Sequence, residues 1–177
     1  MFESDYTING IHATYLKYLY EAKIFKRYID VYMNAAIIGF LYGRLGKKDN
    51  SSQDRARIYA DAFATERLKC DFIYRLIMLL DEGDESTELS VSQRLDRAFR
   101  YDSLSKDDSS QNSHSQNMDR FNSYVLGGIE VLYEKFTSGI TSRDDYINRI
   151  FDVVSKFNEE VEGKDFENKL KKLICSN

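Results

Sequence analysis

The chain has 177 residues, a net charge of −4, and neither proline nor tryptophan. Its length suits one domain or at most two very small ones, and its 42% of hydrophobic residues can form a buried core. Because average usage of about 5% would place roughly nine prolines in such a chain, their absence excludes proline-rich linkers, collagen-like sequence and most loop-rich β architectures.

Membrane and secretion signals are not expected. The apolar run over Val31–Leu45 is interrupted by polar residues and is too short to cross a bilayer. The opening residues, MFESDYTING, lack the basic and apolar regions of a signal peptide. Cys70 and Cys175 form neither a CxxC pair nor a disulfide framework. We therefore expect a cytoplasmic protein with no membrane span, with Cys70 in the core and Cys175 in a tail.

Helical periodicity dominates the first half of the chain. Residues 1–12 show no period and are predicted to form an N-terminal arm. From Ala13 to Leu45 apolar residues recur at helical spacing, with room for a break near residues 23–26, and Gly46 suits the C-terminal cap. The polar run KKDNSSQD then predicts a loop, and residues 54–81 predict a second long helix. Its predicted apolar stripe consists of Ile58, Ala62, Leu68, Phe72, Ile73, Leu76, Ile77 and Leu80.

A short helix and a polar segment follow. Ser90 and Gln93 match a capping box, which predicts a helix over residues 91–101. Residues 103–118 are almost wholly polar and cannot bury enough apolar surface to offset their ordering entropy, so they predict a flexible loop within one domain. Such a loop is either a plain linker or an element that orders on a partner. The buried face predicted for the short helix consists of Leu95, Ala98 and Phe99.

The last third of the chain is again helical in pattern. Residues 121–136 predict a helix that ends at Gly139, and a further helix begins at Thr141 or Ser142 and ends at Gly163. The apolar stripe of this further helix consists of Tyr146, Ile147, Ile150, Phe151, Val154, Phe157 and Val161. Residues 164–174 predict a last amphipathic turn or two. With no alternating strand pattern, the whole chain, 1–177, is expected to be one all-α domain, a bundle of about six helices with one long polar loop.

No motif for catalysis, metal binding or phosphate binding occurs. The two histidines, His12 and His114, fall at the start of the first helix and in the polar segment. The chain has no G-x-S-x-G elbow, no E-x-x-H or H-E-x-x-H helix motif, and no P-loop or G-x-G-x-x-G sequence. We expect a protein that is not an enzyme, with no catalytic residue, metal or cofactor.

Two glycine pairs fall inside apolar helical segments. Gly39 and Gly43 are four residues apart and share a helix face, and Gly127 and Gly128 are adjacent. An interior helical glycine costs about 1 kcal/mol relative to alanine. Close packing of two helix backbones compensates for that cost, so all four glycines are predicted to serve helix packing.

Basic residues concentrate in the first third of the chain. Residues 13–48 hold seven basic and two acidic residues, whereas residues 49–177 hold 18 basic and 25 acidic residues. Tyrosines alternate with these basic side chains, and aromatic rings stack on bases while Lys and Arg bind phosphates. The alternative is an ordinary solvated helix face. The candidate nucleic-acid-binding residues are Lys17, Lys23, Lys26, Arg27, Arg44, Lys47 and Lys48, with a second row at Arg94, Arg97 and Arg100.

Thirteen tyrosines and eleven phenylalanines are more aromatic surface than a small bundle hides comfortably. Aromatic residues are enriched at protein interfaces. We therefore expect a subunit that binds a larger protein partner or forms a homo-oligomer.

Two segments carry a resemblance to a known group of proteins. Val31–Arg44, VYMNAAIIGFLYGR, and Tyr124–Leu132, YVLGGIEVL, are similar to small helical accessory proteins of bacterial DNA-phosphorothioation and related phage-defence systems. The resemblance covers about 23 residues and implies a cytosolic accessory protein that acts on or beside DNA within a larger machine. It carries over no catalytic residues, and the acidic net charge departs from that of a stand-alone DNA binder.

The sequence leads to two main hypotheses, and an enzyme whose site carries no recognisable motif is a third. The first is a non-enzymatic helical accessory subunit of a bacterial multi-protein complex, in anti-phage defence by the resemblance. Such a subunit would contact DNA either directly or through its protein partner. The alternative is a helical module that binds nucleic acid through the basic, tyrosine-rich first third of the chain.

Overall fold

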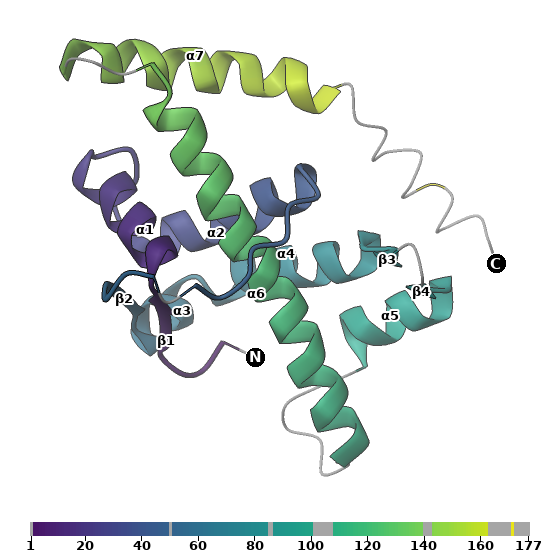
Figure 1. The fold of residues 1–177 in the computed structure, drawn as a ribbon. Helices are drawn as coiled ribbons and strands as arrows, with labels where there is room; N and C mark the ends of the chain where they lie inside the picture. The colour runs from purple at the N-terminus through teal and green to yellow at the C-terminus, as the bar shows by residue number, and fades with distance from the viewer. Residues whose placement is uncertain are drawn as a thin grey trace.

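The computed structural model describes residues 2–49, 51–84, 87–100, 108–139, 143–162 and 171. The described part is mostly helical and also contains two small antiparallel sheets, so a purely all-α fold is a wrong prediction (Figure 1). In chain order the elements are β1 Tyr6–Asn9, α1 Ile11–Glu21, α2 Tyr28–Leu41, β2 Arg55–Ile58, α3 Ala60–Thr65, α4 Arg67–Leu80, β3 Gly83–Asp84, β4 Thr87–Glu88, α5 Val91–Phe99, α6 Asp108–Thr137 and α7 Arg143–Glu162.

The β1–β2 sheet replaces part of the predicted arm and the start of a predicted helix. Tyr6 pairs with Ile58 and Ile8 with Ala56, and Ile8, Ala56 and Ile58 are all buried. Each strand has four residues, which is too short for alternation to be distinguished from helical spacing in sequence. The predicted helix over 54–81 is therefore a strand followed by two helices, α3 and α4.

The closest helix contact joins α2 to α6 through glycines. A Cβ on Gly39 would lie 1.9 Å from the Tyr124 carbonyl oxygen, and one on Gly128 would lie 1.8 Å from the Ala35 carbonyl oxygen. Gly127 approaches the Arg44 carbonyl in the same way. The packing roles predicted for Gly39, Gly127 and Gly128 are confirmed, and no side chain of any size fits at these positions.

The packing role predicted for Gly43 is wrong, because this residue ends α2. Its φ angle is 61°, and a Cβ there would meet nothing within 4 Å. The amide of Arg44 donates to the Gly39 carbonyl over 2.8 Å, as in helix endings with a left-handed glycine. Gly46, predicted as the cap, instead packs on α6 and donates its amide to Ser123 O over 2.8 Å.

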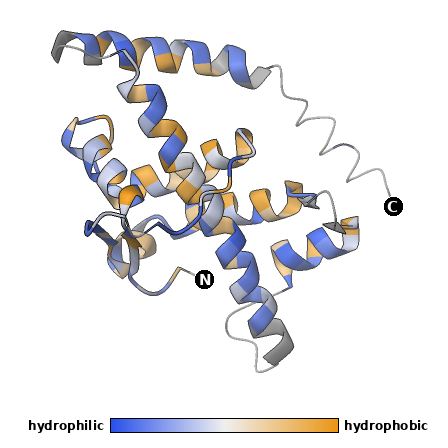
Figure 2. Ribbon diagram, in the orientation of Figure 1, coloured by the Kyte–Doolittle hydropathy of each residue, from blue (hydrophilic) through white to orange (hydrophobic). Residues whose placement is uncertain are grey.

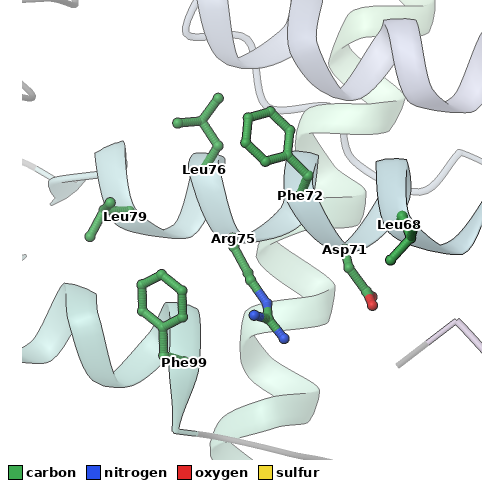
Figure 3. A pocket seen from close by; sticks show the side chains of 7 residues that line it. All are labelled: Leu68, Asp71, Phe72, Arg75, Leu76, Leu79 and Phe99. Carbon is green, nitrogen blue, oxygen red and sulfur yellow. The ribbon is translucent and has the colours of Figure 1, made fainter.

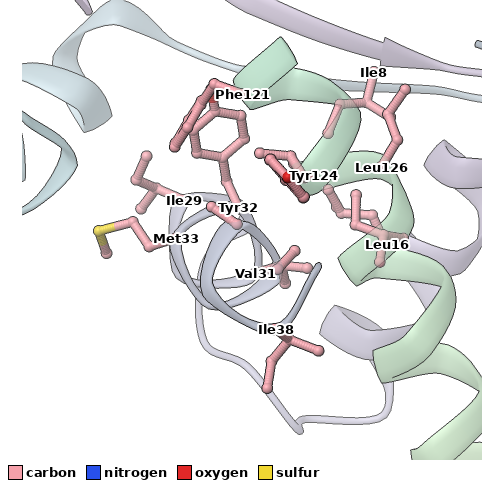
Figure 4. Close-up of a cluster of buried hydrophobic side chains, with 14 of the residues drawn as sticks. Ile8, Leu16, Ile29, Val31, Tyr32, Met33, Ile38, Phe121, Tyr124 and Leu126 are labelled. Carbon is pink, nitrogen blue, oxygen red and sulfur yellow. The ribbon is translucent and has the colours of Figure 1, made fainter. Parts of the chain in front are cut away.

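The core gathers aromatic and aliphatic side chains from α1, α2, α4 and α6 (Figures 2 and 4). Tyr32, Phe63, Tyr74 and Phe121 are the largest fully buried side chains, and Phe2 stacks on Phe63 with ring centroids 5.5 Å apart. The apolar positions predicted over residues 121–136 are buried. They are Phe121, Tyr124, Val125, Ile129, Leu132 and Phe136.

Much of the predicted polar loop is the beginning of α6. This helix starts at Asp108, and residues 103–107 lie outside the described part. His114 and Asn117 are buried, and Asn117 Oδ1 accepts a hydrogen bond from Arg97 Nε over 3.1 Å. A polar contact with another helix therefore stabilises this part of α6, where apolar burial is scarce. Composition alone does not reveal such a contact.

The capping box of α5 is confirmed, because Ser90 and Gln93 exchange both hydrogen bonds. Ala98 is buried as predicted, but Leu95 and Phe99 are exposed. Gly139 follows the end of α6 with a φ angle of 77°. Of the predicted segment over 164–174 only residue 171 is described, and Cys175 lies outside the described residues.

Candidate interaction surface

Helix α4 has an apolar face on both of its sides. Successive residues of an α-helix are about 100° apart, so Leu68 and Phe72 lie opposite Cys70, Tyr74 and Ile77. The second set is buried in the core, whereas Leu68 is 86% exposed and Phe72 is 64% exposed. A surface helix of a lone globular protein turns a polar face to water. The exposed apolar face of α4 is therefore a candidate binding surface.

The exposed face of α4 forms one wall of a groove. Leu76, Leu79, Asp71 and Arg75 continue this wall, and Phe99 of α5 faces it (Figure 3). The hollow has a volume of 430 Å³. We call it the α4–α5 groove, lined by Leu68, Asp71, Phe72, Arg75, Leu76, Leu79 and Phe99.

Arg75 is the main charge in the α4–α5 groove. Its guanidinium lies 5.6 Å from the centre of the Phe99 ring, and it makes no ion pair with any described residue. The only acidic residue of the lining, Asp71, is 3.9 Å from Arg67. An apolar groove with one unpaired guanidinium is the kind of site that binds an amphipathic helix carrying a carboxylate.

The single apolar stripe predicted over residues 54–81 is divided between two faces of α4. Leu68 and Phe72 were grouped with Ile73 and Ile77, although the two pairs point in different directions around the helix. The available signal was that apolar residues occur on two opposite sides of α4, with Leu68 and Phe72 on one side and Tyr74 and Ile77 on the other.

A second apolar surface lies on α7. The apolar stripe predicted for this helix is only partly covered, because Ile147, Phe151 and Val154 are 73%, 70% and 64% exposed. Ile150, Val153 and Phe157 pack against the core. We call the exposed set the α7 stripe, namely Ile147, Phe151 and Val154.

Polar contacts fix α7 on the C-terminal end of α6. Arg149 Nε donates to the Lys135 carbonyl over 2.6 Å, and Lys135 Nζ lies 2.8 Å from Glu160. Tyr42 also donates a hydrogen bond to Glu160. The α7 stripe is therefore presented from an anchored helix.

The predicted basic surface in the first third of the chain is partly neutralised. Lys17 pairs with Asp54 at 2.5 Å, and Lys23 lies over the Tyr20 ring. Arg27 and Arg44 each pair with two acidic residues. These pairs join Arg27 to Asp30 and Glu66, and Arg44 to Glu130 and Glu134. Lys23, Lys26, Lys47 and Lys48 make no ion pair within the described ranges, so four of the seven basic side chains keep an available charge.

The predicted basic row on α5 does not present three similar cations. Arg97 is 11% exposed and donates to Asp81, and Arg94 lies 3.7 Å from Glu82. Arg100 is well exposed and pairs with Asp96 at 3.0 Å. Since Arg97 is held inside the protein, the i, i+3, i+6 spacing does not form a row of phosphate ligands.

Asp81 is the centre of the buried polar cluster beneath α5. Its carboxylate accepts hydrogen bonds from Arg97, Arg120 and Tyr124 at 3.1–3.2 Å. Burial opposes ionisation of Asp81, yet Arg120 and Arg97 hold its pKa below the ordinary value. Burial, assisted by the nearby Asp81 charge, raises the pKa of Tyr124 to about 12. This arrangement links α4, α5 and α6 and has a structural role.

The side chains of His12 and Cys70, which are residue types common in catalysis, are both buried in the protein. His12 is buried, and its Nε2 lies 2.8 Å from Glu130 Oε1. Cys70 lies in the core, as predicted, and burial raises its thiol pKa to about 11. Across the described ranges, no three His, Cys, Asp or Glu side chains group in a way that could hold a metal ion.

Comparison with models of known protein families gives no match, and comparisons with curated proteins and with solved structures give none either. Among the described helices, none combines the length and apolar character that crossing a membrane requires.

Proposed function

We propose that the chain is a non-enzymatic accessory subunit that binds an amphipathic helix of a larger protein in the α4–α5 groove. The observation that carries this proposal is the exposure of Leu68 and Phe72 in a hollow that also holds the unpaired Arg75. Removing a leucine or phenylalanine side chain from water contributes roughly 1.5–3 kcal/mol. Covering both side chains would therefore supply a substantial part of a binding free energy.

The bacterial phage-defence setting is part of the proposal and rests on the resemblance of two segments. In the structure, Gly39, Gly127 and Gly128 of these segments serve the contact between α2 and α6. The resemblance therefore concerns the way in which two helices pack together. The binding role is supported separately, by the α4–α5 groove.

Site-specific photo-crosslinking in the native cells tests the interaction role. With a photoreactive phenylalanine analogue at position 68 or 72, we expect one protein to be captured through a helical peptide and identified by mass spectrometry. The matched control places the analogue at Lys69, which is adjacent in the chain, exposed and outside the groove. The same yield and products at all three positions, or no product at positions 68 and 72, would contradict the proposal.

Nucleic-acid binding has less support, because carboxylates pair with Lys17, Arg27 and Arg44 and leave four of the seven candidate cations, Lys23, Lys26, Lys47 and Lys48. If this alternative holds, the protein should bind DNA with an affinity that falls as salt rises. Reversing these four charges should then abolish the DNA complex in an electrophoretic mobility assay. A complex that is unchanged by the reversal would remove the alternative.

A further inference from the structure

We infer that the chain has a second binding site, for a small zwitterion of the α-amino-acid class, in a cavity between β1, the start of α1 and the loop that follows α2. The polar side chains of its lining include Asn9, His12, Lys48 and Asp49. The cavity shares no lining residue with the α4–α5 groove, so this site is independent of the proposed function.

The size of the cavity suits a small metabolite. Its volume is 250 Å³, which corresponds to about eight molecules of liquid water at about 30 Å³ each. Pockets for drug-sized ligands are larger, at about 300–1,000 Å³. The cavity can therefore enclose a molecule of the size of one amino acid, but not a dinucleotide or a peptide.

His12 lines the cavity and has an unused hydrogen-bonding atom. The residue is 1% exposed, and its Nε2 lies 2.8 Å from Glu130 Oε1. Because a carboxylate only accepts, we assign the ring hydrogen to Nε2, which leaves a lone pair on Nδ1. This Nδ1 has no hydrogen-bond partner among the described residues. A buried acceptor without a partner is unfavourable, and an ammonium group in the cavity would supply the missing hydrogen.

Glu130 fixes the imidazole of His12 from outside the cavity. It is not part of the lining, and its second oxygen accepts a hydrogen bond from Arg44 Nε over 2.9 Å. The hydrogen bond at one ring nitrogen sets the tautomer and leaves the other nitrogen to act. The acceptor at Nδ1 is therefore held ready rather than free to rotate.

Opposite charges occupy adjacent positions of the lining. Lys48 is exposed and forms no ion pair with a described residue. Asp49 is half-buried, and its Oδ1 accepts a hydrogen bond from the Ser51 amide over 2.5 Å. Hydrogen bonds from Ser51 lower the pKa of Asp49, and the charge of His12 lowers it further. The carboxylate of Asp49 and the imidazole of His12 therefore act on the same region of the cavity.

This combination of groups matches an α-amino acid. The ammonium group of such a ligand can donate to His12 Nδ1 and to Asp49, while its carboxylate can pair with Lys48. The Asn9 amide can bond to either group. Inorganic phosphate would be repelled by Asp49, and a metal ion would be repelled by Lys48.

The loop that carries the two charges is held against α6 before any ligand binds. The Gly46 amide donates to Ser123 O over 2.8 Å, and Gly127 closely approaches the Arg44 carbonyl. Leu126, beside Gly127, lines the cavity. Such a preformed wall lowers the ordering cost of binding.

Isothermal titration calorimetry of the full-length protein with each standard α-amino acid tests the site. We expect at least one of them to bind with one molecule per chain. Lys48→Met and Asp49→Asn each remove one charge and should weaken binding by at least about tenfold. Lys47→Met is the matched control, because Lys47 is adjacent, exposed and outside the lining, and it should leave binding unchanged.

His12→Gln tests the buried acceptor. A glutamine amide can still donate to Glu130 but places no acceptor at the position of Nδ1, so binding should weaken by at least about tenfold. If this variant does not fold, the two exposed or half-buried positions, Lys48 and Asp49, decide the result. The amine that lacks the carboxylate and the N-acetyl derivative of the same ligand should each bind at least about tenfold more weakly.

Absence of binding by every amino acid would overturn the inference. Binding that is unchanged in both Lys48→Met and Asp49→Asn would overturn it as well, because the ligand would then use another surface. Inorganic phosphate and Zn²⁺, each titrated alone, should not bind in the cavity, and binding of either one that is lost in these variants would assign the cavity to a different ligand class. The crosslinking at positions 68 and 72 involves other residues, so each proposal can fail without the other.

Discussion

Replacing Asp81 by alanine is expected to lower the free energy of unfolding by about 3–5 kcal/mol, since removal of one partner leaves buried opposite charges uncompensated. Arg97 and Arg120 both lose their carboxylate acceptor, and Arg97 is 11% exposed. Chemical denaturation measures the loss. Asp96→Ala is the control, because it removes the pair with the well exposed Arg100 and should cost under about 1 kcal/mol.

The same carboxylate should make stability depend on acidity. The Asp81 pKa is lowered in the folded protein, so the folded state binds this proton less readily than the unfolded state. Its contribution is present above the unfolded value of about 3.9 and is lost as the pH falls through the folded value. Between neutral pH and pH 2, the free energy of unfolding should fall more steeply for the unmodified chain than for Asp81→Asn. Parallel curves would show that Asp81 is not the ionised centre of the cluster.

The second large effect is expected at the glycine contact. Gly128→Ala would place a methyl group 1.8 Å from the backbone oxygen of Ala35, and no side-chain rotation relieves that clash. The helices α2 and α6 must separate, which should cost at least about 3 kcal/mol, at the upper end for overpacking. A fall in the denaturation midpoint measures this cost.

A glycine outside the contact supplies the matched control. Gly43 has a φ angle of 61° and open space around it, and asparagine tolerates this conformation better than other residues. Gly43→Asn should therefore cost far less than Gly128→Ala. Equal losses for the two variants would mean that backbone conformation, and not the close helix approach, sets the cost.

Local signals in the sequence predicted the helical parts of the fold well. The break between α1 and α2, the capping box at Ser90 and the left-handed Gly139 all depend on residues near one another in the chain. Strands β1 and β2 were missed because their paired residues are far apart in the chain, as Tyr6 and Ile58 are. The start of α6 was missed because Asn117 is held by Arg97, which lies on another helix.

The candidate site was harder to predict than the fold. Leu68 and Phe72 have the composition of core residues, and only the tertiary arrangement shows that the core lies on the other side of α4. Conversely, the sequence suggests a basic binding surface that includes Lys17, Arg27 and Arg44. Acidic residues far along the chain form ion pairs with these three side chains. Neither outcome depends on local spacing. The prediction of surplus aromatic surface did hold for Tyr59, Phe72, Phe99 and Phe151.

Helix α6 has a further consequence as a single uninterrupted rod. Its 30 residues correspond to about 45 Å. Asp81 is held near the middle of this helix at Arg120 and Tyr124, the glycine contact follows at Gly127 and Gly128, and α7 is held at Lys135 near the C-terminal end. A subunit built on such a strut keeps the α4–α5 groove and the α7 stripe at a constant separation. A partner that contacts both surfaces would therefore have to span the length of α6 that lies between them.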